Sequence, residues 1–123
     1  MNDEELKLSE EALLWIKTNY KKVIQKFADT TEYAADELPT TLFMAGSPGA
    51  GKTEISKRLV PRFKQKPIRI DADEIRNLCP GYTGNNAHVF QNAATKGVHI
   101  LYDYALKNNI NVILDGTFAY NGA

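Results

Sequence analysis

Eight consecutive residues in the first half of the chain have the types and spacing needed to bind a polyphosphate. These residues match the pattern G-x-x-x-x-G-K-[ST] at all of its fixed positions. In order, they are Gly46, Ser47, Pro48, Gly49, Ala50, Gly51, Lys52 and Thr53. Glycines allow several backbone N–H groups to turn toward one anion, and a helix that begins at the end of the turn adds the positive end of its dipole. Lys52 is the expected partner of the β- and γ-phosphates and Thr53 that of Mg²⁺. The motif therefore predicts binding of a nucleoside triphosphate with its metal ion.

The segments on either side of this loop have the pattern of a strand followed by a helix. Residues 40–45 form a short apolar run that is typical of a strand buried on both faces. A helix is expected to begin at Lys52 and to end or kink near Val60, because Pro61 would cost about 3 kcal/mol in a helix interior. A glycine-rich turn that merely joins the two elements is the alternative. The position between strand and helix favours the phosphate loop.

Two more strands and two more helices are expected after Pro61. Residues 67–70 have the pattern of a second strand, and Asp71 is the expected N-cap of a helix, with Glu74 as its capping-box partner and Pro80-Gly81 as its end. A longer helix is expected from Asn85 or Asn86 to about Lys107, with Asn108-Asn109 as its C-terminal stop, and then a third strand over 111–115. Such alternation implies parallel strands joined by helical crossovers, an α/β layered fold.

Acidic residues follow two of the expected strands. Ligands of open parallel sheets bind beyond the carboxyl ends of the strands, where Asp71, Asp73 and Asp115 are expected to converge. Asp73 is the candidate for the base that accepts a proton from an acceptor hydroxyl; an acid that only interacts with the helix dipole is the alternative. Asp115 could help to order Mg²⁺ through water or hold the substrate. Thr117 and Arg76 are weaker candidates for substrate binding, since Arg76 could simply pair with Asp73.

An amphipathic helix is expected before this α/β region. Ser9 is its predicted N-cap, and apolar residues recur at helical spacing to the end of the helix near residue 28: Leu13, Ile16, Tyr20, Val23 and Phe27. We therefore divide the chain into an N-terminal helix and linker (1–38) and a P-loop kinase-like domain (39–123). The helix either packs on the sheet or presents a docking face to a partner protein.

Composition excludes several classes of function. Lys and Arg total 15 and Asp and Glu total 15, which argues against broad binding to nucleic acid. Cys79 is the single cysteine, so no internal disulfide and no thiolate zinc cluster is expected. The acidic N-terminus does not have the pattern of a signal peptide, and no apolar run is long enough to span a membrane. A cytoplasmic location is the resulting expectation.

Four short motifs together resemble the zeta toxin group of P-loop kinases. Three of them accompany the phosphate loop: Ile70-Asp71-Ala72-Asp73-Glu74-Ile75-Arg76, Cys79-Pro80-Gly81-Tyr82 and Leu114-Asp115-Gly116-Thr117. The resemblance implies a three-layer P-loop kinase-like fold with a short parallel sheet, in the strand order second, third, first. It also implies ATP and Mg²⁺ as cofactors, a nucleotide sugar (UDP-N-acetylglucosamine, phosphorylated at its 3′-hydroxyl) as substrate, and a protein antitoxin as partner.

The resemblance also assigns roles by position. Lys52 would hold the phosphates, Thr53 the Mg²⁺, and Asp73 would be the catalytic base, while Asp115 and Thr117 would contact the sugar nucleotide. This sequence departs from the family where Asp115 replaces a frequent Glu and Cys79 a common His. Family members continue into a lid with arginines, so the 123-residue chain alone is expected to be weakly active or inactive.

Three other functions remain alternatives at this point. A P-loop kinase could act on another hydroxyl, such as that of a small molecule or a polynucleotide end. A truncated remnant could bind a nucleotide without chemistry and serve as an interaction surface. A switch GTPase is disfavoured, because no Asn-Lys-x-Asp segment that would recognise guanine is present.

Overall fold

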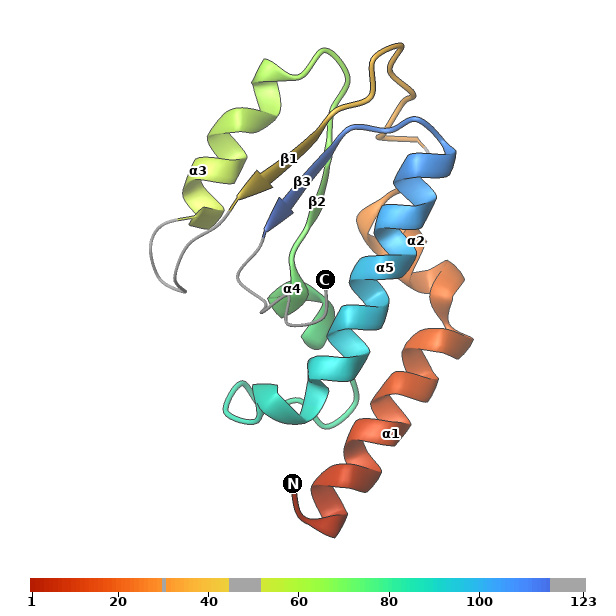
Figure 1. The fold of residues 1–123 in the computed structure, drawn as a ribbon, viewed down its shortest axis with the longest axis vertical. Coiled ribbons are helices and arrows are strands. Elements are labelled where there is room, and N and C mark those ends of the chain that lie inside the picture. The colour runs from red at the N-terminus through yellow and green to blue at the C-terminus, as the bar shows by residue number, and fades with distance from the viewer. Residues whose placement is uncertain (30, 45–51, 116–123) are drawn as a thin grey trace.

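A computed structural model describes residues 1–29, 31–44 and 52–115 of the chain. These residues form an α/β fold around a three-stranded parallel sheet (Figure 1). The strands are β1 (Thr41–Met44), β2 (Ile68–Ile70) and β3 (Val112–Asp115). β3 lies in the centre and β1 and β2 lie at its sides, so the expected strand order is confirmed. Among the described strands, β1, which leads into the phosphate-loop motif, is therefore an edge.

Helices cover both faces of this sheet and give the three expected layers (Figure 1). One face carries α3 (Lys52–Leu59), which continues into a 3₁₀ turn, η1 (Val60–Arg62). The helix thus begins at Lys52 and ends before Pro61, as expected. The other face carries α5 (Gln91–Lys107), and α1 (Asp3–Thr18) and α2 (Tyr20–Phe27) pack along α5.

The hydrophobic core lies between the sheet and these three helices. Alternate residues of the strands face it, because successive side chains of a strand point to opposite sides. Thus Ile68 and Ile70 of β2 and Leu114 of β3 belong to the core, whereas Arg69 reaches Ser56 of α3 on the opposite face. The largest fully buried side chains on the helices and helical turns of the core are Ile16, Val23, Ile75, Val89, Phe90, Val98 and Leu101.

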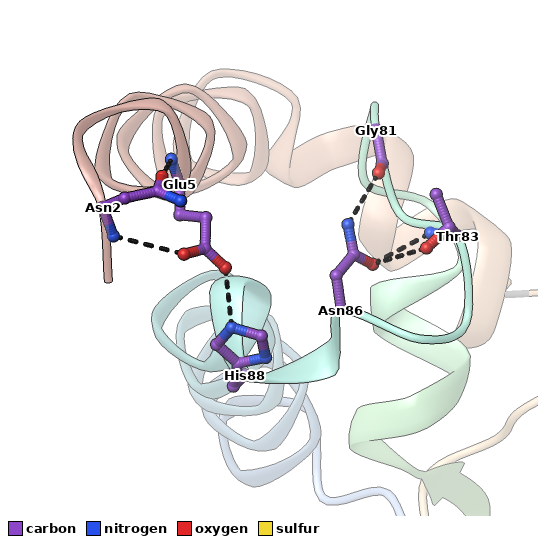
Figure 2. Close-up of polar contacts among 6 residues, drawn as sticks. All are labelled: Asn2, Glu5, Gly81, Thr83, Asn86 and His88. Carbon is purple, nitrogen blue, oxygen red and sulfur yellow. Dashed lines mark hydrogen bonds and ion pairs between the residues drawn. The ribbon is translucent and has the colours of Figure 1, made fainter.

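The N-terminal helix differs from the expectation in its start and its continuity. The helix begins at Asp3 instead of Ser9, because Asn2 and Glu5 form a capping box: the Asn2 side chain accepts from the Glu5 backbone at 2.8 Å, and Glu5 accepts from the Asn2 backbone at 3.2 Å (Figure 2). Ser9 is buried inside α1. The helix also breaks at Asn19, whose side-chain amide donates to the Trp15 carbonyl at 2.9 Å.

The two later helices also differ in detail from the expectation. α4 (Ala72–Arg76) is only five residues long, so it ends before Pro80-Gly81. The long helix is preceded by a 3₁₀ turn, η2 (Ala87–Phe90). Asn86 does not cap it through its side chain, since its oxygen accepts from the Thr83 backbone at 3.0 Å and its amide donates to the Gly81 carbonyl at 3.2 Å (Figure 2). Asn109 stops α5 with φ 57, as expected for a left-handed residue at a helix end.

Candidate functional site

The carboxyl ends of the three strands meet at one edge of the sheet. Met44, the last residue of β1, aligns with Asp115, the last residue of β3. Ile70, the last residue of β2, aligns with Leu114, so the next residue, Asp71, stands at the level of Asp115. The site predicted from the strand ends is therefore brought together by the register of the sheet.

The phosphate-loop motif connects this edge to the start of α3. β1 ends at Met44 and α3 begins at Lys52, which is the strand–loop–helix context that the motif requires (Figure 1). The loop positions Gly46, Ser47, Pro48, Gly49, Ala50 and Gly51 lie outside the described residues, as does Thr117. Lys52 and Thr53 occupy the first two positions of α3, and the description does not extend to their side chains.

Asp71 is one of two buried acids of this edge. It is only 8% exposed, and its carboxylate accepts from the backbone N–H of Asp73 at 2.9 Å, so it caps α4 as expected. Burial raises the pKa of the Asp71 carboxyl above its usual range, and the negative charges of Asp115, Glu74 and Asp73 act in the same direction. A cation bound at this edge would offset both the burial of the Asp71 charge and its repulsion by the neighbouring acids.

Asp115 lies beside Asp71 at the end of the central strand and is also only 8% exposed. Two carboxylates at one sheet edge are oxygen donors of the kind that Mg²⁺ prefers. Within the residues that the structure describes, no cluster of three or more potential ligands could hold a metal ion alone. The two carboxylates of Asp71 and Asp115 fit Mg²⁺ in a nucleotide site, because such a site combines one or two protein oxygens with phosphate oxygens and water.

Asp73 is the exposed acid of the same edge. It lies in the first turn of α4, and its side chain is 64% exposed, so an acceptor molecule can reach it. Arg76 donates to its Oδ1 at 2.5 Å, which shows that the pairing considered for Arg76 is formed. The other terminal nitrogen of Arg76 donates to Oε1 of Gln91 at 2.6 Å.

Glu74 does not have the role expected for it. Asp71 caps the N–H of Asp73, and Glu74 lies instead 3.5 Å from Arg69 of β2, so no reciprocal capping box forms. By the resemblance noted above, His is common at the position of Cys79. Cys79 is 5% exposed and belongs to the hydrophobic core. Its thiol therefore packs inside the protein.

Gln91 and Ser56 are the polar neighbours of the site that sequence reasoning missed. Gln91 lies 15 positions after Arg76, and Ser56 lies 13 positions before Arg69, which donates to its hydroxyl at 3.0 Å. Neither residue belongs to a motif. The one available signal was the position of Gln91 near the predicted start of the long helix.

A cavity of about 440 Å³ lies at the other end of the strands. It is lined by Thr40 and Asn111, which precede β1 and β3, and by side chains of β1, α3 and η1 that include Leu42, Leu59 and Arg62. Because phosphate chemistry is expected at the carboxyl ends of the strands, this cavity is separate from the candidate site.

The parallel sheet, its strand order and the phosphate-loop sequence between β1 and α3 define the class of P-loop kinase-like α/β proteins. The sequence model of the zeta toxin family matches residues 24–121, so the chain belongs to the zeta toxin family. A search of curated proteins gave no match.

A solved structure from the PezAT chromosomal toxin–antitoxin system of the human pathogen Streptococcus pneumoniae has a similar fold. The two superpose with a TM-score of 0.64 at 22% sequence identity. The match covers 95% of this chain and 47% of that chain, so the present chain spans about half the length of the matched protein. Over the residues described here, no helix has the length and apolar character needed to cross a membrane.

Proposed function

We propose that this chain is the nucleotide-binding part of a toxin kinase that transfers the γ-phosphoryl group of ATP to a hydroxyl of a nucleotide sugar. By family resemblance, the acceptor is the 3′-hydroxyl of UDP-N-acetylglucosamine. The observation that carries the proposal is the sheet edge at which a complete phosphate-loop sequence follows β1 while Asp71, Asp73 and Asp115 gather at the carboxyl ends of the two other strands. Phosphoryl transfer depends mainly on positioning and on charge stabilisation, and this edge can supply both.

Each residue of the edge has a distinct role in the proposed reaction. Lys52 holds the β- and γ-phosphates, and Thr53 and Asp115 hold the Mg²⁺, the latter through water. Asp73 accepts the proton of the acceptor hydroxyl, whose oxygen then attacks the γ-phosphorus. The bond from that phosphorus to the bridging oxygen breaks, and ADP leaves. The exposure of Asp73 supports its role as base, because the acceptor must reach it from solvent.

The proposal includes a protein antitoxin as partner and the cytoplasm as location. The matched structure comes from a toxin–antitoxin system, which supports an antitoxin as the partner. ATP and nucleotide sugars are cytoplasmic metabolites, and the free, buried Cys79 fits a reducing compartment.

Nucleotide binding is tested first, by calorimetric titration of MgATP and MgGTP into the chain and two variants. Lys52→Ala removes the proposed phosphate partner, and Lys57→Ala removes an exposed lysine of the same helix as a matched control. We expect Lys52→Ala to abolish most of the heat and Lys57→Ala to leave it unchanged. Equal heats for the original chain and Lys52→Ala would contradict the proposal.

Phosphoryl transfer is tested with labelled ATP and a panel of nucleotide sugars, nucleosides and polynucleotide ends. We expect weak formation of labelled product from a nucleotide sugar, in line with the low activity expected of the chain alone, and we expect Asp73→Asn to lower it by about 10²–10⁴-fold. Asp103→Asn, an exposed acid on α5, is the control. Undiminished turnover by Asp73→Asn would exclude this carboxylate as the base, and labelling of another acceptor class would replace the nucleotide sugar.

A further inference from the structure

Arg76 is a buried cationic side chain beside the proposed base. Its side chain is 9% exposed, whereas the carboxylate of Asp73 that it contacts is 64% exposed. One terminal nitrogen donates to Asp73 and the other to Gln91. In the described part of the chain, its third nitrogen, Nε, is buried without a hydrogen-bond partner.

Stability alone does not explain such a residue. A buried N–H without a partner costs on the order of 1–3 kcal/mol, and a buried ion pair is often no more stabilising than apolar residues of the same size. The close packing of Ile75 against Gly97 already attaches α4 to α5 without it. The Arg76 guanidinium therefore orients the Asp73 side chain, whereas the packing of Ile75 on Gly97 holds α4 against α5.

The hydrogen bonds restrict Asp73 from two sides. Its backbone N–H donates to Asp71, which fixes the start of α4, and its Oδ1 accepts from Arg76. Arg76 is itself located by Gln91 at the first turn of α5. This chain of contacts ties one carboxylate oxygen to the rigid long helix and leaves the carboxylate as a whole open to solvent.

We propose that Arg76 is the positioning residue of the transfer site: held by Gln91, it binds Oδ1 of Asp73 and leaves Oδ2 to accept the proton of the acceptor hydroxyl. The inference rests on the proposed function, because it assigns Asp73 the role of base. A base that is held in one orientation supports catalysis through geometry, and a misplacement of about 1 Å can cost on the order of 10²-fold in rate. In this assignment Arg76 binds Asp73 and has no role at the phosphates, so we expect MgATP affinity to be independent of it.

The test is a double-mutant cycle on kcat in the phosphoryl-transfer assay. We expect Arg76→Gln to lower kcat by about 10–10²-fold with little change in MgATP affinity, and Arg76→Lys to recover part of the loss. In the Asp73→Asn background, Arg76→Gln should have no further effect, because both substitutions remove the same function. Losses that multiply, or an unchanged kcat in Arg76→Gln, would overturn the proposal.

A second measurement does not depend on turnover or on nucleotide binding. Three-bond NMR couplings to Cγ of Asp73 report whether its χ1 angle occupies one rotamer or several. We expect one rotamer in the original chain, averaging in Arg76→Gln, and intermediate values in Gln91→Ala, which removes no charge. Rotamer averaging in the original chain would overturn the positioning role even if the kinase activity were established. A single rotamer without any transfer would instead count against the proposed function.

Discussion

Ile75 of α4 packs so closely on Gly97 of α5 that a Cβ atom at Gly97 would lie 2.6 Å from Cγ2 of Ile75. Ordinary contacts of a Cβ are at least about 3.4 Å, so no side chain other than hydrogen fits there without a shift of the Ile75 side chain or of one helix. α4 is five residues long and carries Asp73, the proposed base, in its first turn. The absence of a side chain at Gly97 therefore helps to set the position of the candidate site.

The first prediction is that Gly97→Ala destabilises the protein. Alanine favours a helix interior over glycine by about 0.5–1 kcal/mol, but overpacking a tight contact costs about 1–3 kcal/mol. We expect a net loss of about 1–2 kcal/mol in the free energy of unfolding, measured by urea denaturation. Asn92→Ala, at an exposed position of α5, is the control and should not lower stability. A Gly97→Ala variant that is more stable than the original chain would show that the helices are not in close contact.

The fold could be predicted from local patterns because each strand is bounded by residues with strong preferences. Apolar runs marked the three strands, Pro61 marked the end of α3, and Asn109 marked the end of α5. Asp71 was predicted as a cap from its position between a strand and a helix, and it is one. The strand order came from the family resemblance, and the sheet confirms it.

The features that the sequence did not predict have one of two causes. Either two local patterns competed, or the contact joins residues that are distant in sequence. Ser9 and Asn2 are both good caps, and the three acids after Asn2 favour the earlier start. Asn19 interrupts a continuous apolar stripe, so periodicity alone gave one helix. The bond from Arg76 to Gln91 depends on how α4 meets α5, which no local pattern determines.

The second prediction concerns Asn111, which joins three segments at the amino ends of the strands. Its side chain is buried: Oδ1 accepts from the Thr40 backbone at 2.8 Å, and the amide donates to Asp36 at 3.0 Å and to the Gln65 carbonyl at 2.9 Å. We expect Asn111→Ala to lower the free energy of unfolding by about 1–3 kcal/mol, because the three hydrogen bonds of this buried side chain are lost. Asn85→Ala, on the exposed loop before η2, should change it by less than about 0.5 kcal/mol. Equal small effects of both substitutions would show that the network does not stabilise the fold.

The third prediction is a pH dependence that comes from Asp71. Because burial raises its pKa in the folded state, the folded protein binds its proton more tightly than the unfolded chain does. Stability contributed by this group is therefore present below the ordinary pKa of 3.8 and is lost as the pH rises through the higher folded value. Asp71→Asn retains a capping oxygen without the charge, so we expect it to be more stable than the original chain at neutral pH.

The control for Asp71 separates the charge from the cap. Asp71→Ala removes both, and it should be less stable than Asp71→Asn by about 1 kcal/mol at every pH. Urea denaturation across the acidic and neutral range provides the comparison. If the difference in the free energy of unfolding between the original chain and Asp71→Asn does not shrink below pH 3.8, the pKa of the Asp71 carboxyl is not raised in the folded protein.

The fourth prediction concerns Glu5, which joins the start of α1 to the 3₁₀ turn before α5. Its side chain accepts from the Asn2 backbone and lies 2.8 Å from Nε2 of His88 (Figure 2). The backbone bond of the Asn2 cap and then His88 lower the pKa of Glu5 below 4.5, so its contribution is present above that pH and is lost as the pH falls through the folded value. Glu5→Gln retains the shape of the cap, and we expect it to reduce hydrogen-exchange protection of the Leu6 amide by about twofold to fivefold at neutral pH only. Glu4→Gln, an exposed acid in the same turn, is the control. Equal loss of protection in both variants would mean that the helix dipole alone acts there and that the contact with His88 contributes nothing.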